Sequence, residues 1–329
     1  MALLSHLSAL PTLKSDLALV EIKLENAVVA NDPYLTEIAK HLITAGGKRV
    51  RPGFTIASSA VEQSNAVPVS DEVLMGGVAV ELVHLGSLYH DDVMDEAEMR
   101  RNVPSVNAVW GNHTAILAGD FLLARASEIA ASLGTEIAGL LARTIGELCE
   151  GQILELQSTY KPSRTEESYE QSIAGKTASL LSTACRIGGL TAGLERRTVD
   201  QLTTFGHTYG MAFQIVDDIL DIIATEDQLG KPAGNDLIEG VYTLPVLLAL
   251  ESDEGEQLQE LLGKELTTEE RDQALSLIRS TDAVEEAFTR AQFWAQKAKL
   301  ELETLPPSPA TNALFAATNH LLDRAQSAS

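Results

Sequence analysis

A helical repeat of apolar residues runs through almost the whole chain and limits the folds that it can adopt. Between turn signals, apolar side chains recur three and four positions apart, as in Leu122, Leu123, Ala126, Ile129 and Ala130. This spacing places them on one face of an α-helix. Alternating β-branched residues, which are typical of strands, are scarce. The sequence therefore predicts an all-α protein.

Clusters of Gly, Pro, Asn and Ser divide the chain into predicted helices of about 10 to 25 residues. These clusters lie at residues 31–33, 64–71, 102–112, 158–168, 230–235 and 306–309. Ser163 and Thr267 are each followed three residues later by a glutamate, which is the spacing of a capping box and predicts that helices start there. No long polar linker divides the chain, so we expect one all-α domain over residues 1–329.

Charge and cysteine content argue against several functions. The formal net charge is −23, from 47 acidic and 24 basic residues, so no nucleic-acid-binding surface is expected. Cys149 and Cys185 indicate neither a disulfide framework nor a zinc site, and the N-terminus has no signal-peptide pattern. No run reaches roughly 18 consecutive apolar residues, so no integral membrane segment is expected. We expect a cytoplasmic protein.

Two acidic motifs end apolar helical runs, "DDVMD" and "DDILD". Residues three or four positions apart share a helix face, so each motif forms one carboxylate patch. A solvated helix end is the alternative. Oxygen ligands without nearby cysteine favour a hard cation, and Mg²⁺ typically bridges carboxylates to substrate phosphates. The predicted metal ligands are Asp91, Asp92 and Asp95 in the first motif, and Asp217, Asp218 and Asp221 in the second.

Basic residues gather at a few places in this acidic chain. Arg100 and Arg101 follow the first aspartate motif. The motif "GGKRVRP" crowds three basic residues, Lys48, Arg49 and Arg51, onto a turn loosened by glycine. Guanidinium groups bind phosphate oxygens bidentately, whereas the alternative for the loop is a solvated basic turn. The clusters predict a ligand that carries phosphate groups.

Two further basic signals are weaker. Lys176 and Thr177 open onto the apolar run of "GKTASLL", but the full P-loop spacing and its preceding strand are missing, so a P-loop is excluded. Lys231 follows the second aspartate motif in "QLGKPAGNDL". Taken alone, both are more typical of ordinary surface residues than of a binding site.

The order of these motifs, from about residue 46 to residue 245, resembles the trans-polyprenyl diphosphate synthases of the polyprenyl synthetase family. The resemblance implies an antiparallel all-α bundle around a deep central cavity, the isoprenoid synthase fold, and usually a homodimer. It implies that isopentenyl diphosphate is bound by Lys48, Arg51, His84 and Arg101. It implies that the allylic diphosphate is bound by Arg100, Lys176, Thr177, Gln214 and Lys231.

The implied reaction condenses isopentenyl diphosphate with an allylic diphosphate. Breaking the allylic C–O bond builds negative charge on the departing diphosphate, which Mg²⁺ between the aspartate motifs, together with Arg100, Lys176 and Lys231, would stabilise. Positioned isopentenyl diphosphate then adds to the allylic cation. The resemblance implies that the released diphosphate takes the proton, so the aspartates hold metal and do not act as acids.

Two positions depart from the family pattern. Many relatives read EGKxTLP where this chain has "EGVYTLP", so Val241 stands where a further lysine often lies. Lys231 must then contribute more, or a water must take the place of the lysine. The RRG of many relatives is RRN here, so Asn102 alters the loop after the arginines without removing a charge. Neither change touches a predicted metal ligand.

Two small residues, Gly86 and Ser87, stand at the fifth and fourth positions before Asp91 and bear on product length. One helical turn rises about 5.4 Å, roughly an isoprene unit, so a bulky side chain here would stop elongation early. Short-chain members of the family tend to carry aromatic residues at these positions. We therefore expect a long all-trans polyprenyl diphosphate of the kind used as a quinone side chain. Alternatively, Gly86 only permits close helix packing, the floor of the pocket lies deeper, and the product length does not follow from this position. A shorter geranylgeranyl or farnesyl product is a separate alternative.

Two other classes of protein compete with an active synthase. A class I terpene cyclase has a similar bundle and one DDxxD patch, but usually a different second metal motif and no GGKRxRP loop. A non-catalytic subunit of a heteromeric synthase tends to lose aspartates or basic residues, and both aspartate motifs are intact here. We therefore expect a Mg²⁺-dependent prenyltransferase.

Overall fold

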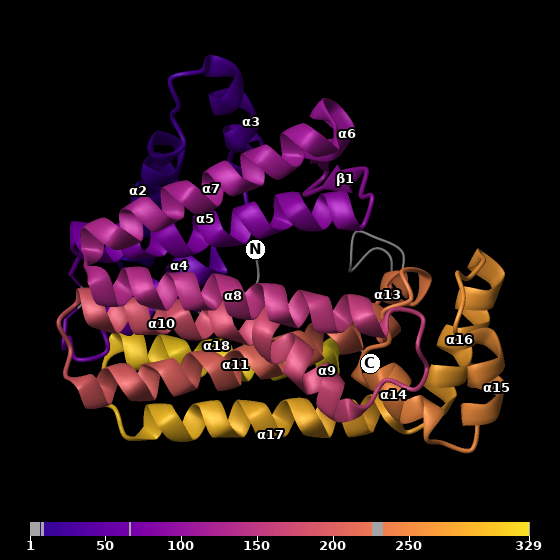
Figure 1. Cartoon of the computed structure of the whole chain (residues 1–329). Coiled ribbons are helices and arrows are strands. Elements are labelled where there is room, and N and C mark those ends of the chain that lie inside the picture. The colour runs from indigo at the N-terminus through magenta and orange to yellow at the C-terminus, as the bar shows by residue number, and fades with distance from the viewer. Residues whose placement is uncertain (1–6, 8–9, 66, 226–232, 329) are drawn as a thin grey trace. The chain divides into compact units, whose positions relative to one another are not determined.

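The computed structural model describes all residues except 1–6, 8–9, 66, 226–232 and 329. The described part is almost entirely α-helical (Figure 1). Its only strands are β1 (Met99–Arg100) and β2 (Val103–Pro104), which form one antiparallel hairpin. The expectation of an all-α protein is confirmed.

The described helices follow the predicted breaks only in part. The helix α6 (Val106–Trp110) lies inside the cluster at 102–112, α9 (Glu166–Ile173) begins inside the cluster at 158–168, and part of the cluster at 230–235 lies outside the described residues. Clusters at 31–33, 64–71 and 306–309 separate α2 from α3, α4 from α5 and α17 from α18. In chain order and with the labels of Figure 1, the helices are α2 (Leu13–Ala27), α3 (Pro33–Thr44), α4 (Val50–Ser59), α5 (Asp71–Met94), α6 (Val106–Trp110), α7 (Asn112–Leu133), α8 (Thr135–Ser158), α9 (Glu166–Ile173), the π-helical η1 (Ala174–Ala178), α10 (Ser179–Thr191), α11 (Arg196–Ile223), α13 (Asn235–Ile238), α14 (Leu244–Leu250), α15 (Gly255–Leu261), α16 (Thr268–Ser280), α17 (Ala283–Glu303) and α18 (Pro309–Ala328).

The two predicted helix starts had different outcomes. Thr267 is the N-cap of α16 in a complete capping box, because its hydroxyl accepts from the Glu270 N–H and the Glu270 carboxylate accepts from the Thr267 N–H. The prediction for Ser163 was wrong. Thr165 is the N-cap of α9, with extended backbone and a hydroxyl that accepts from the Ser168 N–H at 3.1 Å. Ser163 lies in the turn before it.

Contacts between Cα atoms divide the chain into two compact units. Unit 1 comprises Met1–Ile145, Leu180–Thr204 and Glu301–Ala317. Unit 2 comprises Gly146–Ser179, Phe205–Leu300 and Thr318–Ser329. The boundaries fall within α8, α11, α17 and α18, and beside the first residue of α10. The expectation of a single domain stays a prediction.

Within unit 1, α5 is the central helix and packs chiefly against α7 and α4 (Figure 1). Gly77 lets α5 approach α4, since a Cβ atom there would lie 3.3 Å from the Cα of Pro52. Among the residues that the structure describes, α5 alone is long and apolar enough to cross a membrane, and 72% of its most apolar stretch is buried within the protein. This burial is typical of a core helix.

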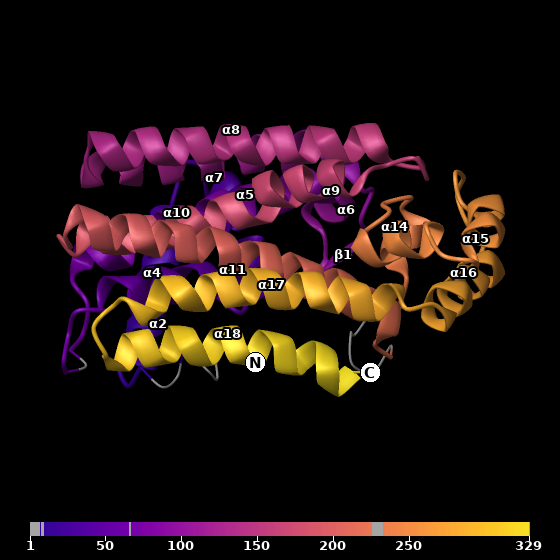
Figure 2. The same ribbon diagram turned by 90° about the horizontal axis from the view of Figure 1, so that it is seen from below.

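Within unit 2, α14, α15 and α16 pack together (Figure 2). Thr243 is the N-cap of α14 and Pro245 stands in its first turn, so the "TLP" motif opens this helix. The Arg279 guanidinium of α16 donates to the carbonyl oxygen of Ile222 at 2.8 and 2.5 Å. A cation on the last carbonyl groups of a helix is favourable, so this contact anchors the end of α11.

Candidate active site

The first aspartate motif lies at the carboxyl end of α5. Asp91 and Asp92 are in its last turn, and Asp95 is its C-cap. Carboxylates at this end of a helix face the negative pole of the helix dipole, which costs roughly 0.3–1 kcal/mol each at a surface. Stability of the helix therefore does not explain why three aspartates gather here, and a bound cation would offset this cost.

Asp92 is the buried member of this motif. Its side chain is 0% exposed, and its Oδ1 accepts from Nε of Arg100 at 2.6 Å and lies 2.6 Å from Nη2 of the same guanidinium in an ion pair. Its Oδ2 is buried and has no hydrogen-bond partner among the described residues. Burial raises the pKa of Asp92, and the Arg100 charge offsets part of that shift. One oxygen is thus held by a cation while the other is left for a further ligand.

The hairpin after α5 sends its two arginines to different partners. Arg100 is on β1 and reaches Asp92, whereas Arg101 and Asn102 form the two-residue loop. Both loop residues have positive φ, 53° and 62°, as a type I′ turn requires. Asn is among the non-glycine residues that tolerate this conformation best. The change from RRG to RRN therefore keeps the turn.

The Arg101 side chain lies against the loop of "GGKRVRP". Its Nη1 donates to the carbonyl oxygen of Leu42 at 3.0 Å and to that of Gly46. Gly46 has a φ of +84°, and a Cβ atom on Gly47 would lie 2.7 Å from Nη1 of Arg101. The two glycines are needed here because the backbone turns sharply and the guanidinium packs against it.

Three of the four predicted isopentenyl diphosphate ligands are electrostatically coupled in unit 1. Burial lowers the pKa of Arg51, and its buried Nε has no hydrogen-bond partner in the described chain. Burial, followed by the charges of Arg51 and Arg101, holds the pKa of His84 well below its usual range. His84 is therefore neutral at physiological pH and has an N–H to donate. Lys48, the fourth, is exposed on the neighbouring loop.

Arg49, between these residues in sequence, has a different role. Its Nε and Nη2 donate to Glu21 at 2.6 and 2.9 Å, and its Nη1 donates to the buried Glu81 at 2.9 Å. A buried guanidinium that is matched by two carboxylates stabilises the loop and has little left to offer a ligand. This explains why Lys48 and Arg51, rather than Arg49, are available.

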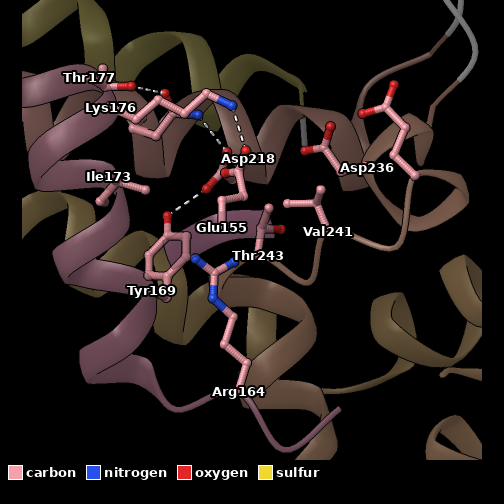
Figure 3. A pocket seen from close by; sticks show the side chains of 12 residues that line it. Glu155, Arg164, Tyr169, Ile173, Lys176, Thr177, Asp218, Asp236, Val241 and Thr243 are labelled. Atoms are coloured by element: carbon pink, nitrogen blue, oxygen red, sulfur yellow. Dashed lines mark hydrogen bonds and ion pairs between the residues drawn. The ribbon is translucent and has the colours of Figure 1, made fainter. Parts of the chain in front are cut away.

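The second aspartate motif lies in the last turns of α11, in unit 2. Asp218 is buried, and its Oδ2 accepts from the Tyr169 hydroxyl at 2.5 Å while its Oδ1 accepts from Nε2 of Gln214 at 2.8 Å (Figure 3). Burial raises the pKa of Asp218 to about 7. Neutral donors therefore orient this carboxyl group without supplying a charge that would match it.

The other two members of this motif have their own contacts. Asp217 is 43% exposed and lies 3.5 Å from Nη2 of Arg324 in α18. Asp221 is buried, and its Oδ2 accepts from the Asp236 N–H at 3.3 Å. The motif thus presents one accessible carboxylate and two that are fixed by the surrounding structure.

Lys176 and Thr177 lie in η1, the π-helical segment between α9 and α10. Lys176 Nζ lies 2.5 Å from the Glu155 carboxylate, and the Thr177 hydroxyl donates to Oε1 of Gln214 at 2.6 Å. Gln214 in turn donates to Asp218, so one chain of hydrogen bonds joins η1 to the second aspartate motif. Such π-helical turns occur frequently at functional sites.

Glycines allow the helices of this network to approach closely. A Cβ atom on Gly151 would lie 2.5 Å from the Lys176 backbone nitrogen, and one on Gly175 would lie 2.6 Å from the Glu147 carbonyl oxygen. A Cβ atom on Gly210 would lie 2.6 Å from the Ala178 Cα. Gly151 and Gly210 each stand one turn before a network residue, Glu155 or Gln214. Close packing at these glycines thus brings α8, η1 and α11 within hydrogen-bond reach.

A cavity of about 110 Å³ adjoins this network. Lys176, Thr177, Gln214 and Asp218 line it, and so does Val241, where many relatives have a lysine (Figure 3). The structure therefore brings together four of the predicted site residues in unit 2. Lys231, which the resemblance also implies, lies outside the described residues.

The cavity residues that sequence reasoning missed include Tyr169, Glu155 and Arg164. Tyr169 stands seven positions before Lys176, or about two helical turns, and that spacing on one face was the available signal. Glu155 and Arg164 carry no such signal, since each belongs to a different segment and reaches the cavity only through the fold.

The donors fit a hard divalent cation. Within the described residues, no three His, Cys, Asp or Glu side chains are gathered as a ready-made metal site. Mg²⁺ usually takes one or two carboxylates together with substrate phosphates and waters, so a complete protein cage is not needed. The buried Oδ2 of Asp92 is an oxygen of the required kind.

The two residues predicted to control product length differ in their surroundings. Gly86 is buried against α7, and a Cβ atom there would lie 3.1 Å from the Gly119 carbonyl oxygen and from Cγ of Leu123. This favours close helix packing as its role. Ser87 is half-buried, donates to the His84 carbonyl oxygen at 2.9 Å and stands one turn before Asp91. A role in setting product length stays a prediction for both.

Comparison with known proteins places this chain among isoprenoid enzymes. Residues 32–278 match the polyprenyl synthetase family. The chain is 41% identical over 303 residues to heptaprenyl diphosphate synthase component 2 of Geobacillus stearothermophilus, covering 92% of this chain and 93% of that protein. It is 39% identical over 314 residues to nonaprenyl diphosphate synthase of Mycobacterium tuberculosis, covering 94% and 93%.

A solved structure agrees with this placement. The polyprenyl synthase from Caulobacter crescentus, complexed with calcium and isoprenyl diphosphate, matches with a TM-score of 0.88 and 31% identity over 95% of this chain and 96% of that one. This chain therefore belongs to the polyprenyl synthetase family and has the all-α isoprenoid synthase fold. It is a prenyltransferase that makes polyprenyl diphosphate.

Proposed function

We propose that this chain condenses isopentenyl diphosphate with an allylic diphosphate to make a long all-trans polyprenyl diphosphate. The observation that carries the proposal is the pair of intact DDxxD motifs at the ends of α5 and α11, each beside basic or amide side chains suited to diphosphate. The names of the two relatives support a product of about seven to nine isoprene units.

We propose Mg²⁺ as the metal, held by Asp91, Asp92 and Asp95 and by Asp217, Asp218 and Asp221. Carboxylate oxygens are the ligands that Mg²⁺ prefers, and a calcium-bound relative is consistent with a divalent cation. When bound, Mg²⁺ would neutralise the charge that builds on the departing diphosphate. The Arg100 guanidinium would keep one oxygen of Asp92 in place and leave the other for the metal.

The isopentenyl diphosphate site would be the basic group of unit 1. Arg51 and Arg101 would supply positive charge for the diphosphate. His84 would donate a hydrogen bond, and because it is neutral it adds no charge repulsion with these arginines. Exposed Lys48 would close over the diphosphate from the loop. Holding the substrate by its diphosphate leaves its double bond available for attack on the allylic cation.

The cavity of unit 2 would hold the allylic diphosphate, and Arg100 of unit 1 is proposed as a ligand from the resemblance alone. Lys176 would leave Glu155 and donate to the diphosphate, while Thr177 and Gln214 would donate polar hydrogens. Lys231 is proposed from the resemblance alone. These donors act where negative charge develops, which is where stabilisation accelerates the reaction most.

An elongation assay tests this proposal. The purified protein would be incubated with Mg²⁺, radiolabelled isopentenyl diphosphate and primers of several lengths, and the dephosphorylated products would be sized by thin-layer chromatography. We expect incorporation that stops when EDTA is added, with products of about seven to nine units as in the relatives. A cyclic product made without isopentenyl diphosphate would overturn the proposal in favour of a terpene cyclase.

A second candidate function is supported by one relative. The name of the Geobacillus protein, component 2, states that it is part of a synthase with more than one component. Under this alternative the chain is the catalytic subunit and needs a partner. Activity of the purified chain alone would exclude it, whereas activity that appears only when a second polypeptide is added would support it.

We further propose a homodimer, a cytoplasmic location and a quinone side chain as the fate of the product. The homodimer and the alternative with a partner subunit are distinguished by light scattering on the active preparation, since a homodimer has twice the chain mass and one kind of polypeptide. Deleting the gene and measuring the side-chain length of the remaining quinone would test the fate of the product.

A further inference from the structure

Arg164 is a buried arginine that no predicted role includes. It lies in the loop before α9, is 8% exposed and lines the cavity with Lys176 and Val241. Figure 3 shows its guanidinium pointing toward Tyr169 and Thr243. Since this cavity also borders the second aspartate motif, a cation in it stands beside the proposed chemistry.

The guanidinium is only partly satisfied within the protein. Its Nη1 donates to the Tyr242 carbonyl oxygen at 3.1 Å, and its carbon lies 5.5 Å from the centre of the Tyr169 ring. Its Nε and Nη2 are buried and have no hydrogen-bond partner among the described residues. Burying such donors without a partner is costly, and the contact with the ring offsets only part of that cost.

The two unpartnered nitrogens form one edge of the guanidinium. Nε and Nη2 carry parallel N–H groups, and this edge is the one that binds two oxygens of a phosphate or carboxylate bidentately. The carboxylates of Glu155 and Asp218 interact electrostatically with Arg164 and act to raise its pKa, yet neither accepts a hydrogen bond from it. The edge is thus formed and left for a ligand with paired anionic oxygens.

The cation balance of the cavity points the same way. Lys176 is already paired with Glu155, and Val241 contributes no charge where many relatives have a lysine. Asp218, Asp236 and Glu239 add further carboxyl groups to the lining. A diphosphate that enters this acidic lining is bound better when a second cation acts together with Lys176, and Nε and Nη2 of Arg164 have no hydrogen-bond partner among the described residues.

We propose that Arg164 binds the diphosphate of the allylic substrate through Nε and Nη2, in place of the lysine that Val241 replaces. The inference rests on the proposed function. Arg164 would contact the oxygens on which charge develops, so it would be a catalytic residue of this chain. Loss of the arginine should therefore weaken binding of the allylic substrate and leave binding of isopentenyl diphosphate unchanged.

The test compares Arg164→Gln and the double variant Arg164→Gln with Val241→Lys. Binding of inorganic pyrophosphate in the presence of Mg²⁺ would be measured by isothermal titration calorimetry, and KM by steady-state kinetics for each substrate. We expect Arg164→Gln to weaken pyrophosphate binding and to raise the KM of the allylic primer, each by roughly 10-fold or more. The KM of isopentenyl diphosphate should be unchanged. The added lysine should restore most of the loss.

Arg290→Gln is the matched control. Arg290 is a surface arginine of the same unit that pairs with Glu166 at 2.8 Å, so it should leave pyrophosphate binding unchanged. Circular dichroism would confirm that each variant folds. If Arg164→Gln does not fold, Arg164→Lys replaces it, since this keeps the charge but loses the bidentate edge and should still weaken pyrophosphate binding.

Three outcomes would overturn the inference. The first is wild-type pyrophosphate affinity in a folded Arg164→Gln or Arg164→Lys protein. The second is equal effects on the KM of both substrates, and the third is a defect that the lysine at 241 does not relieve, because both indicate a structural role. Failure of the proposed function looks different, since the wild-type protein itself would then incorporate no labelled isopentenyl diphosphate.

Discussion

The two aspartate motifs have the same spacing but different surroundings. In the first, Asp92 is paired with the Arg100 guanidinium and keeps one buried oxygen without a partner. In the second, both oxygens of Asp218 accept from neutral donors, Tyr169 and Gln214. In the first motif the buried aspartate is paired with an arginine, whereas in the second the buried Asp218 is held by neutral donors and the arginine contact, from Arg324, is made by the more exposed Asp217. Motifs with the same spacing can therefore hold their carboxylates in different ways.

The largest expected effect comes from removing one aspartate of either motif. Asp91→Ala and Asp217→Ala should each lower turnover by roughly 100-fold or more, because each removes a metal ligand where charge develops. Turnover would be measured with labelled isopentenyl diphosphate at saturating Mg²⁺. Asp282→Ala, an exposed aspartate at the start of α17, is the control and should be active. Near wild-type turnover in either variant would remove that motif from the metal site.

Arg100→Gln should have the next largest effect, and it tests whether the first motif depends on its arginine. It removes the charge that faces Asp92 and leaves a buried carboxylate unmatched, so we expect a loss of roughly 10- to 100-fold in kcat/KM for the allylic primer. The Mg²⁺ concentration for half-maximal rate should rise as well. An unchanged Mg²⁺ requirement would show that Asp92 does not depend on this arginine.

A smaller effect is expected from Tyr169→Phe in the second motif. The change removes the hydroxyl that donates to Asp218 and keeps the ring beside Arg164, so only the orientation of the carboxyl group is lost. We expect kcat to fall by roughly 10-fold, with the thermal midpoint shifted by only a few degrees. If kcat is unchanged, Gln214 alone is enough to orient Asp218.

The smallest effect on rate, though not on product, is expected before the first motif. Ser87→Phe should shorten the product with little loss of stability, because Ser87 is half-buried and stands on the face of Asp91. Gly86→Phe should instead destabilise the fold by about 1–3 kcal/mol or more, since its side chain would meet α7. Product chromatography and thermal melting would distinguish the two. A stable Gly86→Phe protein with a shorter product would contradict the packing role.

Much of the fold could be predicted because the apolar period of a helix persists along most of the chain. Helix breaks at 31–33 and 306–309 were readable from proline and polar residues, and Thr267 from its capping box. The predicted helix start at Ser163 was wrong because Thr165, two residues later, is an equally suitable N-cap residue and has the extended backbone of a cap. The π-helical turn at Lys176 has no local sequence signature, since it depends on packing against α8 and α11.

The candidate site was predictable only where its residues are neighbours in sequence. In the aspartate motifs and the "GGKRVRP" loop, the residues that indicate metal or phosphate binding are adjacent or nearly adjacent in sequence. Arg164 and Glu155 do not, because burial and a shared cavity make them relevant, and both are properties of the fold. The ion pairs of Arg49 could not be predicted either, since its partners Glu21 and Glu81 are distant in sequence.

The proposal depends most on each of the two aspartate motifs binding divalent cations when a diphosphate is present. The most direct measurement counts bound Mn²⁺ by electron paramagnetic resonance in the presence of an unreactive allylic thiolodiphosphate, for the wild type, Asp91→Ala and Asp217→Ala. We expect each variant to bind fewer Mn²⁺ ions than the wild type and to hold the analogue more weakly. Wild-type Mn²⁺ stoichiometry and analogue affinity in either variant would contradict it.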